Sequence, residues 1–347
     1  MKAAVLESYG KIEIKDLPLP EMREDEVMVR VRYASICGSD QHIYKGEFHP
    51  RTRLPLIPGH EFAGEIERVG KQVQNFKKGE KVTVDPIIAC GNCPACLRNH
   101  FPACTSLKLI GIDLDGGFAG FVSVRPEMLY RLPNNVSDEH AALVELLSIG
   151  FHASRRAGIK EGDSIAIWGA GKVGQAILHA SRTLSSGPVF LVDILEERLN
   201  IAKKAFPSCI SVNSLNDDPL EVIRSCTGGK GVDVAFEAVG HFTEVKDRFN
   251  PVRSCIQAIR GGGKVCTLGL GDEPVGLVMK ELIWKEAHII ASRVSHGEFA
   301  DAIQALSKGI LNPSAMITGV MDLGEADKAF DLLAKAPQNH LKILLKL

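Results

Sequence analysis

Residues 164–174 read SIAIWGAGKVG, a short apolar run followed directly by a glycine-rich turn. Gly169, Gly171 and Gly174 have the spacing G-x-G-x-x-G between an expected strand and an expected helix. The first glycine of such a turn permits the tight bend, the second lets a pyrophosphate approach the backbone, and the third lets the helix pack on the strand. The pattern predicts that Gly169, Gly171, Val173 and Gly174 contact a dinucleotide, although six residues alone also fit an ordinary loop.

An acidic residue follows at the distance that a dinucleotide-binding turn requires. Asp193 ends the next apolar run, VFLVD, nineteen positions after Gly174. A carboxylate there accepts hydrogen bonds from a ribose 2′-hydroxyl and repels a 2′-phosphate, which favours NAD over NADP. Arg198 would suit NADP, but it lies a turn into the next helix, and Asp193 occupies the position that reads the ribose. We keep Arg198 as a cofactor-binding candidate. The alternative role of Asp193 is the N-cap of the helix that begins with ILEER.

The pattern of expected strands and helices changes near residue 147. Beyond it, strand and helix segments alternate through PVFLVD, ILEERLNIAKKAF, GVDVAFEAVG and GGKVCTLGLG, which predicts an α/β fold with a parallel, doubly wound sheet. Before it, EVMVRVRYAS and GEKVTVDPII alternate as strands do, and turns interrupt them often. The C-terminal segment mixes the helical stretches ADAIQALSKGI and EADKAFDLLAKA with a final strand, LKILLKL.

Size and charge narrow the possible classes of protein. A chain of 347 residues exceeds one ordinary hydrophobic core, so we expect two domains. The 41 basic and 42 acidic residues give a net charge of −1, which gives no reason to expect nucleic acid or a membrane as partner. The start, MKAAVLESYGKIEIKD, has no signal-peptide pattern. We expect a cytoplasmic protein, in which clustered cysteines bind metal rather than form disulfides.

Four of the nine cysteines lie within CGNCPACLRNHFPAC, residues 90–104. Cys90, Cys93, Cys96 and Cys104 have the spacing C-x2-C-x2-C-x7-C. Four thiolates match a tetrahedral zinc whose shell is filled by protein, which leaves no open position for a substrate. An iron–sulfur cluster is one alternative, but its cysteine runs usually end beside a proline, and none follows Cys104. Unpaired thiols are the other alternative.

A second metal site is predicted from scattered residues. Cys37 lies in ASICGSDQH, and His60 and Glu61 lie in PLIPGHEFAG. Together they supply three metal ligands and leave room for water or an alcohol. Taken singly, these residues also fit a buried apolar cysteine, a core histidine and a surface carboxylate. Glu145 strengthens the case because it lies in the apolar run VELLSIGFHA, where a buried carboxylate needs a cation. A lysine or arginine is the alternative partner of Glu145.

Six motifs occur in order: CGSDQH, PGHEFAG, the four-cysteine stretch, DGGFA, VELLSIGFHA and GAGKVG. With them the whole chain resembles the zinc-dependent medium-chain alcohol dehydrogenases, in the branch of the sorbitol and threonine dehydrogenases. The resemblance implies a GroES-like, β-rich catalytic domain plus a Rossmann domain. It places residues 1–146 and 285–347 in the catalytic domain, with a structural-zinc lobe at residues 86–108, and residues 147–284 in the Rossmann domain. It also implies a homodimer or homotetramer.

The resemblance further assigns roles to individual residues. The catalytic zinc would be held by Cys37, His60 and Glu61, with Glu145 on the metal or on its water, and the four-cysteine stretch would hold the structural zinc. Ser39 and His42, in the pattern C-x-[ST]-x-x-H, would relay the proton of the alcohol to the surface. Hydride would pass to the nicotinamide of NAD. A surface position without function is the alternative for His42.

A few positions bear on the substrate. Leu146 stands where many relatives have proline, and Ile43 stands where sorbitol dehydrogenases often have an aromatic residue that contacts substrate. Arg293, in IIASRVSHGEF, lies near the arginine that faces the substrate in polyol dehydrogenases, and its fork suits a carboxylate; a surface salt bridge is the alternative. Phe118 of DGGFA is the other expected substrate contact. We therefore expect oxidation of a polyol or sugar acid, with L-threonine or another amino alcohol as the alternative substrate. A catalytically silent nucleotide-binding protein is the non-enzymatic alternative.

Overall fold

A computed structural model of the chain describes residues 1–240, 250–271, 274–336 and 338–347. It separates into two compact units, one formed by Met1–Glu145 with Phe299–Leu347 and the other by Leu146–Glu298. The chain returns to the first unit at Phe299, later than the expected residue 285, because strand β15 (His288–Ala291) still pairs with the sheet of the second unit. Within the described ranges, none of the helices combines the length and apolar character needed to cross a bilayer.

The second unit is a doubly wound parallel sheet, as the sequence predicts. In its described residues six parallel strands follow the order β12-β11-β10-β13-β14-β15, so the order reverses between β10 and β13. This is the strand order of dinucleotide-binding sheets, which bind their ligand at the reversal point. Its further strands are β10 (Ile165–Trp168), β11 (Val189–Asp193), β12 (Ile210–Asn213), β13 (Val232–Glu237) and β14 (Ile259–Thr267). Its helices are α3 (Val144–Ala157, which begins in the first unit), α4 (Lys172–Leu184), α5 (Glu196–Ala205), α6 (Pro219–Cys226), α7 (Pro251–Ala258) and α8 (Met279–Lys285).

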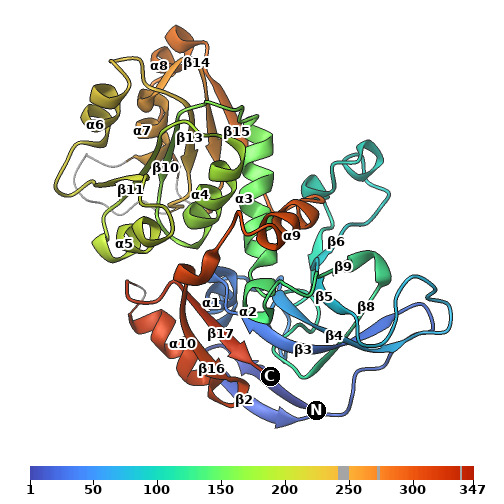
Figure 1. Cartoon of the computed structure of the whole chain (residues 1–347). Helices are drawn as coiled ribbons and strands as arrows, with labels where there is room; N and C mark the ends of the chain where they lie inside the picture. The colour runs from blue at the N-terminus through green and yellow to red at the C-terminus, as the bar shows by residue number, and fades with distance from the viewer. Residues whose placement is uncertain (241–249, 272–273, 337) are drawn as a thin grey trace. The chain divides into compact units, whose positions relative to one another are not determined.

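Helices cover both faces of this sheet (Figure 1). One apolar layer joins α4 and α5 to the sheet through side chains such as Ile177 and Leu199. The other layer joins α6 and α7 to the opposite face through Ile223 and Ile256. Because alternate strand residues point to opposite faces, β10 contributes Ile165 and Ile167 to one layer and Ala166 and Trp168 to the other.

The first unit is mainly antiparallel. In its described part a seven-stranded sheet has the order β16-β17-β3-β4-β5-β9, with β8 paired to β3. The strands of the unit are β1 (Lys2–Ser8), β2 (Lys11–Asp16), β3 (Val27–Ser35), β4 (Glu61–Val69), β5 (Lys81–Val84), β6 (Ile87–Ile88), β7 (Lys108–Leu109), β8 (Phe121–Val124), β9 (Leu129–Arg131), β16 (Ile317–Asp322) and β17 (Lys342–Lys346). The helices are α1 (Gly38–Tyr44), α2 (Asp138–Ala141), α9 (Phe299–Ser307) and α10 (Ala326–Lys335).

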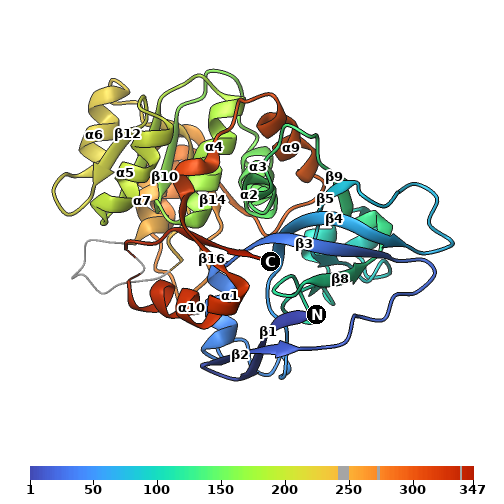
Figure 2. The same ribbon diagram turned by 60° about the horizontal axis from the view of Figure 1, so that its bottom comes forward.

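Three distant parts of the sequence meet at one end of strand β3. The strand ends at Ser35, two residues before Cys37, and Ser35 pairs with Glu61 at the start of β4. On its other side Ser35 pairs with Leu344 of the C-terminal strand β17. Figure 2 shows β16 and α10 beside β1 and β2 of the same unit. This pairing brings residues near 37, 60 and 342 together.

Candidate active site

Cys37 lies at the start of helix α1. Its backbone N–H donates to Asp40 Oδ2 at 2.8 Å, and this bond fixes the turn that carries the thiol. Asp40 is buried, and its other oxygen, Oδ1, lies 3.5 Å from Nδ1 of His60. One carboxylate therefore orients both side chains, a role typical of residues that support metal ligands. The sequence gives no direct signal for Asp40, which looks like an ordinary residue in the first turn of a helix.

His60 and Glu61 are both buried at the start of strand β4. Ligand atoms of Cys37, His60 and Glu61 all lie within 4.8 Å of one another, so the structure assembles the expected trio. Burial opposes the charged form of His60, yet the neighbouring Asp40 and Cys37 raise its pKa well above the ordinary value. A site that draws positive charge onto a buried histidine is electrostatically suited to a divalent cation.

Glu61 has a partner that sequence reasoning missed. Lys342 of strand β17 is fully buried, and its Nζ donates to Oε1 of Glu61 at 2.6 Å and to Oε2 at 2.5 Å. Burial opposes the ionisation of Glu61, but Lys342 and then His60 lower the pKa of its carboxyl. Burial likewise lowers the pKa of Lys342, but the charges of Glu61 and Cys37 outweigh it and raise that pKa above its usual value. The pair is therefore ionic.

Glu145 lies in the first turn of α3 and is almost fully buried. Burial raises the pKa of its carboxyl to about 8, and the nearby Glu61 adds to this effect, while His60 and Lys342 oppose it. These influences place the Glu145 side chain within electrostatic reach of His60 and Glu61. It does not share the close spacing of the Cys37–His60–Glu61 trio, so its direct coordination of a metal stays a prediction.

The two expected relay residues lie on helix α1. Ser39 Oγ lies 3.3 Å from Nε2 of His60. His42 is half-exposed, its ring stacks on Phe48 with centroids 6.0 Å apart, and its Nδ1 pairs with Oε2 of Glu47. The hydroxyl thus contacts a candidate ligand, and the imidazole is in contact with solvent, as a relay requires.

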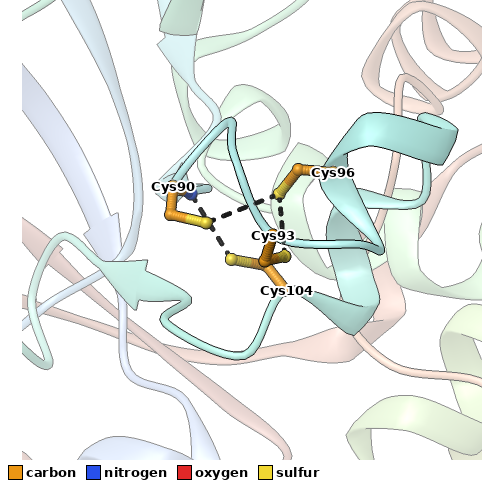
Figure 3. Close-up of side chains that lie close together, drawn as sticks. All are labelled: Cys90, Cys93, Cys96 and Cys104. Atoms are coloured by element: carbon orange, nitrogen blue, oxygen red, sulfur yellow. Dashed lines mark hydrogen bonds between the residues drawn. The ribbon is translucent and has the colours of Figure 1, made fainter.

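The four-cysteine stretch forms the second cluster, and Figure 3 shows its thiols pointing toward one another. Sγ of Cys96 lies 3.5 Å from that of Cys93 and 3.9 Å from that of Cys90. A tetrahedral zinc with bonds of about 2.3 Å places its sulfurs about 3.8 Å apart, so the spacing fits. The ligands of an iron–sulfur cluster bind several irons and lie farther apart. Backbone N–H groups of Cys96 and Thr105 lower the pKa of Cys93 to about 5, while burial raises that of Cys96 to about 12.

Each glycine of the turn after β10 is explained by a different feature of its surroundings. Gly169 has φ +98°, and a Cβ there would lie 2.8 Å from the carbonyl oxygen of Ala238. A Cβ on Gly174 would lie 1.7 Å from the carbonyl oxygen of Gly169, so only glycine lets α4 pack here. At Gly171 the nearest atom to such a Cβ is Nη1 of Arg198, at 3.8 Å, which leaves the backbone open to a ligand. Val173 is partly buried and packs against the core beneath the turn.

Asp193 connects this turn to the end of strand β11. Its Oδ2 accepts from the backbone N–H of Ala170 at 2.6 Å, and its Oδ1 accepts from Ile194 and Leu195 at 2.7 and 2.9 Å. The N-cap of α5 is Leu195, so Asp193 is not the cap residue itself. The carboxylate is therefore fixed beside the glycine turn, where a ribose would lie in a dinucleotide site.

Two further residues are expected to contact substrate. Phe118 is fully buried in the core of the first unit, where its ring meets Phe330 edge to face, and its contact with substrate stays a prediction. The aromatic ring fills the space that Gly59 leaves open, since a Cβ on Gly59 would lie 2.4 Å from it. Ile43 is also fully buried. Arg293 is exposed in the segment after β15, and its role stays a prediction.

Comparisons with known proteins agree with this geometry. Residues 23–134 match the alcohol dehydrogenase GroES-like domain, and residues 173–308 match the zinc-binding dehydrogenase domain. The chain is 32% identical to the sorbitol dehydrogenase of Bacillus subtilis, covering 99% of this chain and 97% of that protein. It is 30% identical to the L-threonine 3-dehydrogenase of Bacillus velezensis, covering 96% of each. The structure of RspB from Escherichia coli CFT073 with NADH superposes with a TM-score of 0.90 at 28% identity, covering 100% and 99% of the two chains.

The protein therefore belongs to the zinc-binding alcohol dehydrogenase family. The expected fold, a GroES-like unit and a Rossmann unit, is confirmed. The expected class is confirmed as well: an oxidoreductase of CH–OH groups that uses zinc and a nicotinamide dinucleotide.

Proposed function

We propose that this protein oxidises a secondary alcohol of a polyol or a sugar acid to a ketone, with NAD as the hydride acceptor. The observation that carries the proposal is the trio of Cys37, His60 and Glu61, of which His60 and Glu61 are buried and which is separate from the four-thiol cluster. A cluster of three ligands leaves one position of a tetrahedral metal open to substrate, whereas four thiolates leave none. The first cluster is therefore assigned to chemistry and the second to structure.

The residues of the trio fit a catalytic zinc. Cys37 and His60 supply sulfur and nitrogen ligands, Glu61 supplies oxygen, and Glu145 lies within electrostatic reach of His60 and Glu61. Zinc held there would lower the pKa of the substrate hydroxyl, and NAD would serve as the hydride acceptor. Ser39 takes the hydroxyl proton, and His42 with Glu47 passes it to solvent. Arg293 binds the carboxylate of a sugar acid.

Asp193 is proposed to select NAD over NADP. We expect the wild-type enzyme to prefer NAD, because the carboxylate accepts from ribose hydroxyls and repels a 2′-phosphate. Asp193→Asn removes the charge and keeps an oxygen acceptor. We expect it to lower the preference for NAD, measured as kcat/KM with NAD divided by kcat/KM with NADP, by about tenfold. Steady-state kinetics with both cofactors measure the ratio. Equal use of NADP by the wild-type enzyme contradicts the assignment.

A substrate panel tests the proposed reaction. We expect NADH formation with polyols or aldonates to exceed that with L-threonine. If the substrate is an aldonate, Arg293→Ala should raise its KM by about tenfold or more and leave the KM of neutral polyols nearly unchanged, because only the carboxylate loses its charged partner. A clear preference for L-threonine would identify an amino-alcohol dehydrogenase instead. No NADH with any member of the panel would favour a nucleotide-binding protein without this activity.

A further inference from the structure

The buried ammonium of Lys342 is an unusual neighbour for a metal site. The side chain is fully buried, comes from the C-terminal strand, and contacts a residue 281 positions away in the sequence. Its partner Glu61 belongs, with the thiol of Cys37, to the group of candidate metal ligands, whose ligand atoms lie within 4.8 Å of one another. A lysine in such a place brings positive charge close to the position where a divalent cation binds.

Without a cation, this group of acidic side chains is unfavourable in the protein interior. A buried carboxylate is costly unless a charge of opposite sign or good hydrogen bonds compensate it. In the structure Lys342 supplies that compensation for Glu61, because both carboxylate oxygens accept from the same ammonium. The site therefore has a positive charge of its own before any metal arrives.

We infer that Lys342 is the resident counter-cation of the metal site: it holds Glu61 in place in the metal-free protein and competes with the metal for Glu61 once the metal binds. The inference rests on the proposed role of Glu61 as a metal ligand. Lys342 is thus a positioning residue with two opposite effects. It stabilises the folded site before the metal binds, and it lowers the affinity of the site for the metal.

The geometry distinguishes a competitor from a supporting residue. A residue that supports a metal ligand usually holds one atom of that ligand and leaves the other directed at the metal. Lys342 instead engages both oxygens of Glu61, at 2.6 and 2.5 Å, so a metal that binds Glu61 shares an oxygen with the ammonium and draws electron density from that bond. The ammonium and the metal also repel each other, because they carry like charge at short range. Both effects oppose metal binding.

The test compares Lys342→Met, Glu61→Gln and the double variant with the wild-type chain. Zinc release to increasing chelator and the melting temperatures of zinc-loaded and metal-free protein are measured for each. The release step that disappears in Cys37→Ser is assigned to this site and not to the four-cysteine cluster. Lys285→Met is the matched control, because the Nζ of Lys285 also has fixed partners, the carbonyl oxygens of Ile256, Gln257 and Ile259, and belongs to the other unit.

We expect Lys342→Met to bind zinc about tenfold more tightly than the wild-type chain, because a repelling charge and a competitor for Glu61 are gone. Its metal-free form should melt well below the wild type, whereas its zinc-loaded form should lose much less. Glu61→Gln in the same chain should restore the metal-free melting temperature, because no buried carboxylate remains to be compensated. Lys285→Met should lower both melting temperatures alike and leave zinc release unchanged.

Three results would overturn the inference. Weaker zinc binding by Lys342→Met would make Lys342 a support for Glu61, and equal losses in the metal-free and loaded forms would make it a packing residue. If metal-free Lys342→Met does not fold, the double variant decides: a folded double variant supports the inference, and an unfolded one contradicts it. A wild-type chain that takes up zinc only in the four-cysteine cluster contradicts the proposed function as well, so the two failures are distinct.

Discussion

Replacing His60 with Ala should lower kcat/KM by about 10³-fold or more and leave NAD binding almost unchanged. The imidazole is buried, lies within 4.8 Å of the other two ligand candidates and is oriented by Asp40, so no other side chain replaces it. A metal that activates an alcohol contributes several kcal/mol to the transition state, and each 1.36 kcal/mol is about tenfold in rate. The glycine turn belongs to the other unit and does not depend on His60.

Steady-state kinetics with the best substrate of the panel, together with fluorescence titration of NADH, measure the two effects separately. His288→Ala, which removes an exposed histidine from strand β15, is the control and should keep full turnover. Turnover retained by His60→Ala would refute the assignment of the catalytic metal site. Loss of turnover together with loss of NADH binding would indicate general unfolding instead.

The second large effect is expected at the four-cysteine cluster. Replacing Cys93 with Ser should remove one zinc per chain and lower the melting temperature by roughly 10 °C, which corresponds to about 3–5 kcal/mol in a domain of this size. The loop around the cluster has only short 3-10 turns at Cys96–Arg98 and Phe101–Ala103, so the metal is its main internal connection. The enzyme that remains folded should still turn over, because this cluster is not the site of chemistry.

Zinc analysis and thermal unfolding check this expectation. Cys226→Ser is the matched control, because Cys226 is an exposed thiol at the end of α6, outside the cluster. Unchanged zinc content and melting temperature in Cys93→Ser would show that the four thiols do not bind structural zinc.

Local patterns in the sequence predicted the parts of this protein that short-range chemistry determines. The glycine turn is one case, since the clashes that a Cβ would make at Gly169 and Gly174 depend on their immediate neighbours. The four-cysteine cluster is another, because its ligands lie within fifteen residues. The trio of Cys37, His60 and Glu61 was less visible, since its members come from separate segments and each has an ordinary alternative role. Only the order of the motifs along the chain indicated that these three residues belong to one site.

The features that sequence reasoning missed depend on pairing between distant segments. In LKILLKL, Lys342 looks like a surface charge on a short strand, and only the register of β17 against β3 places it inside. The boundary at Phe299 depends on β15, which adds one more strand to the parallel sheet of the second unit. The short apolar run of β15 does not predict this pairing. The DGGFA motif does not show that Phe118 packs in the core of the first unit, because the packing depends on distant partners such as Phe330.

The C-terminal position of Lys342 has a consequence for how the protein is made. Ribosomes add residues at about 5–20 per second, so Lys342 is synthesised about 15–55 s after its partner Glu61, 281 positions earlier. During that interval the nascent chain already carries every ligand of the trio but not the lysine that neutralises one of them. A chain that stops before residue 342 would contain a complete set of metal ligands and still lack its buried cation. A strand that is synthesised long after the trio thus supplies the charge that balances one of its members.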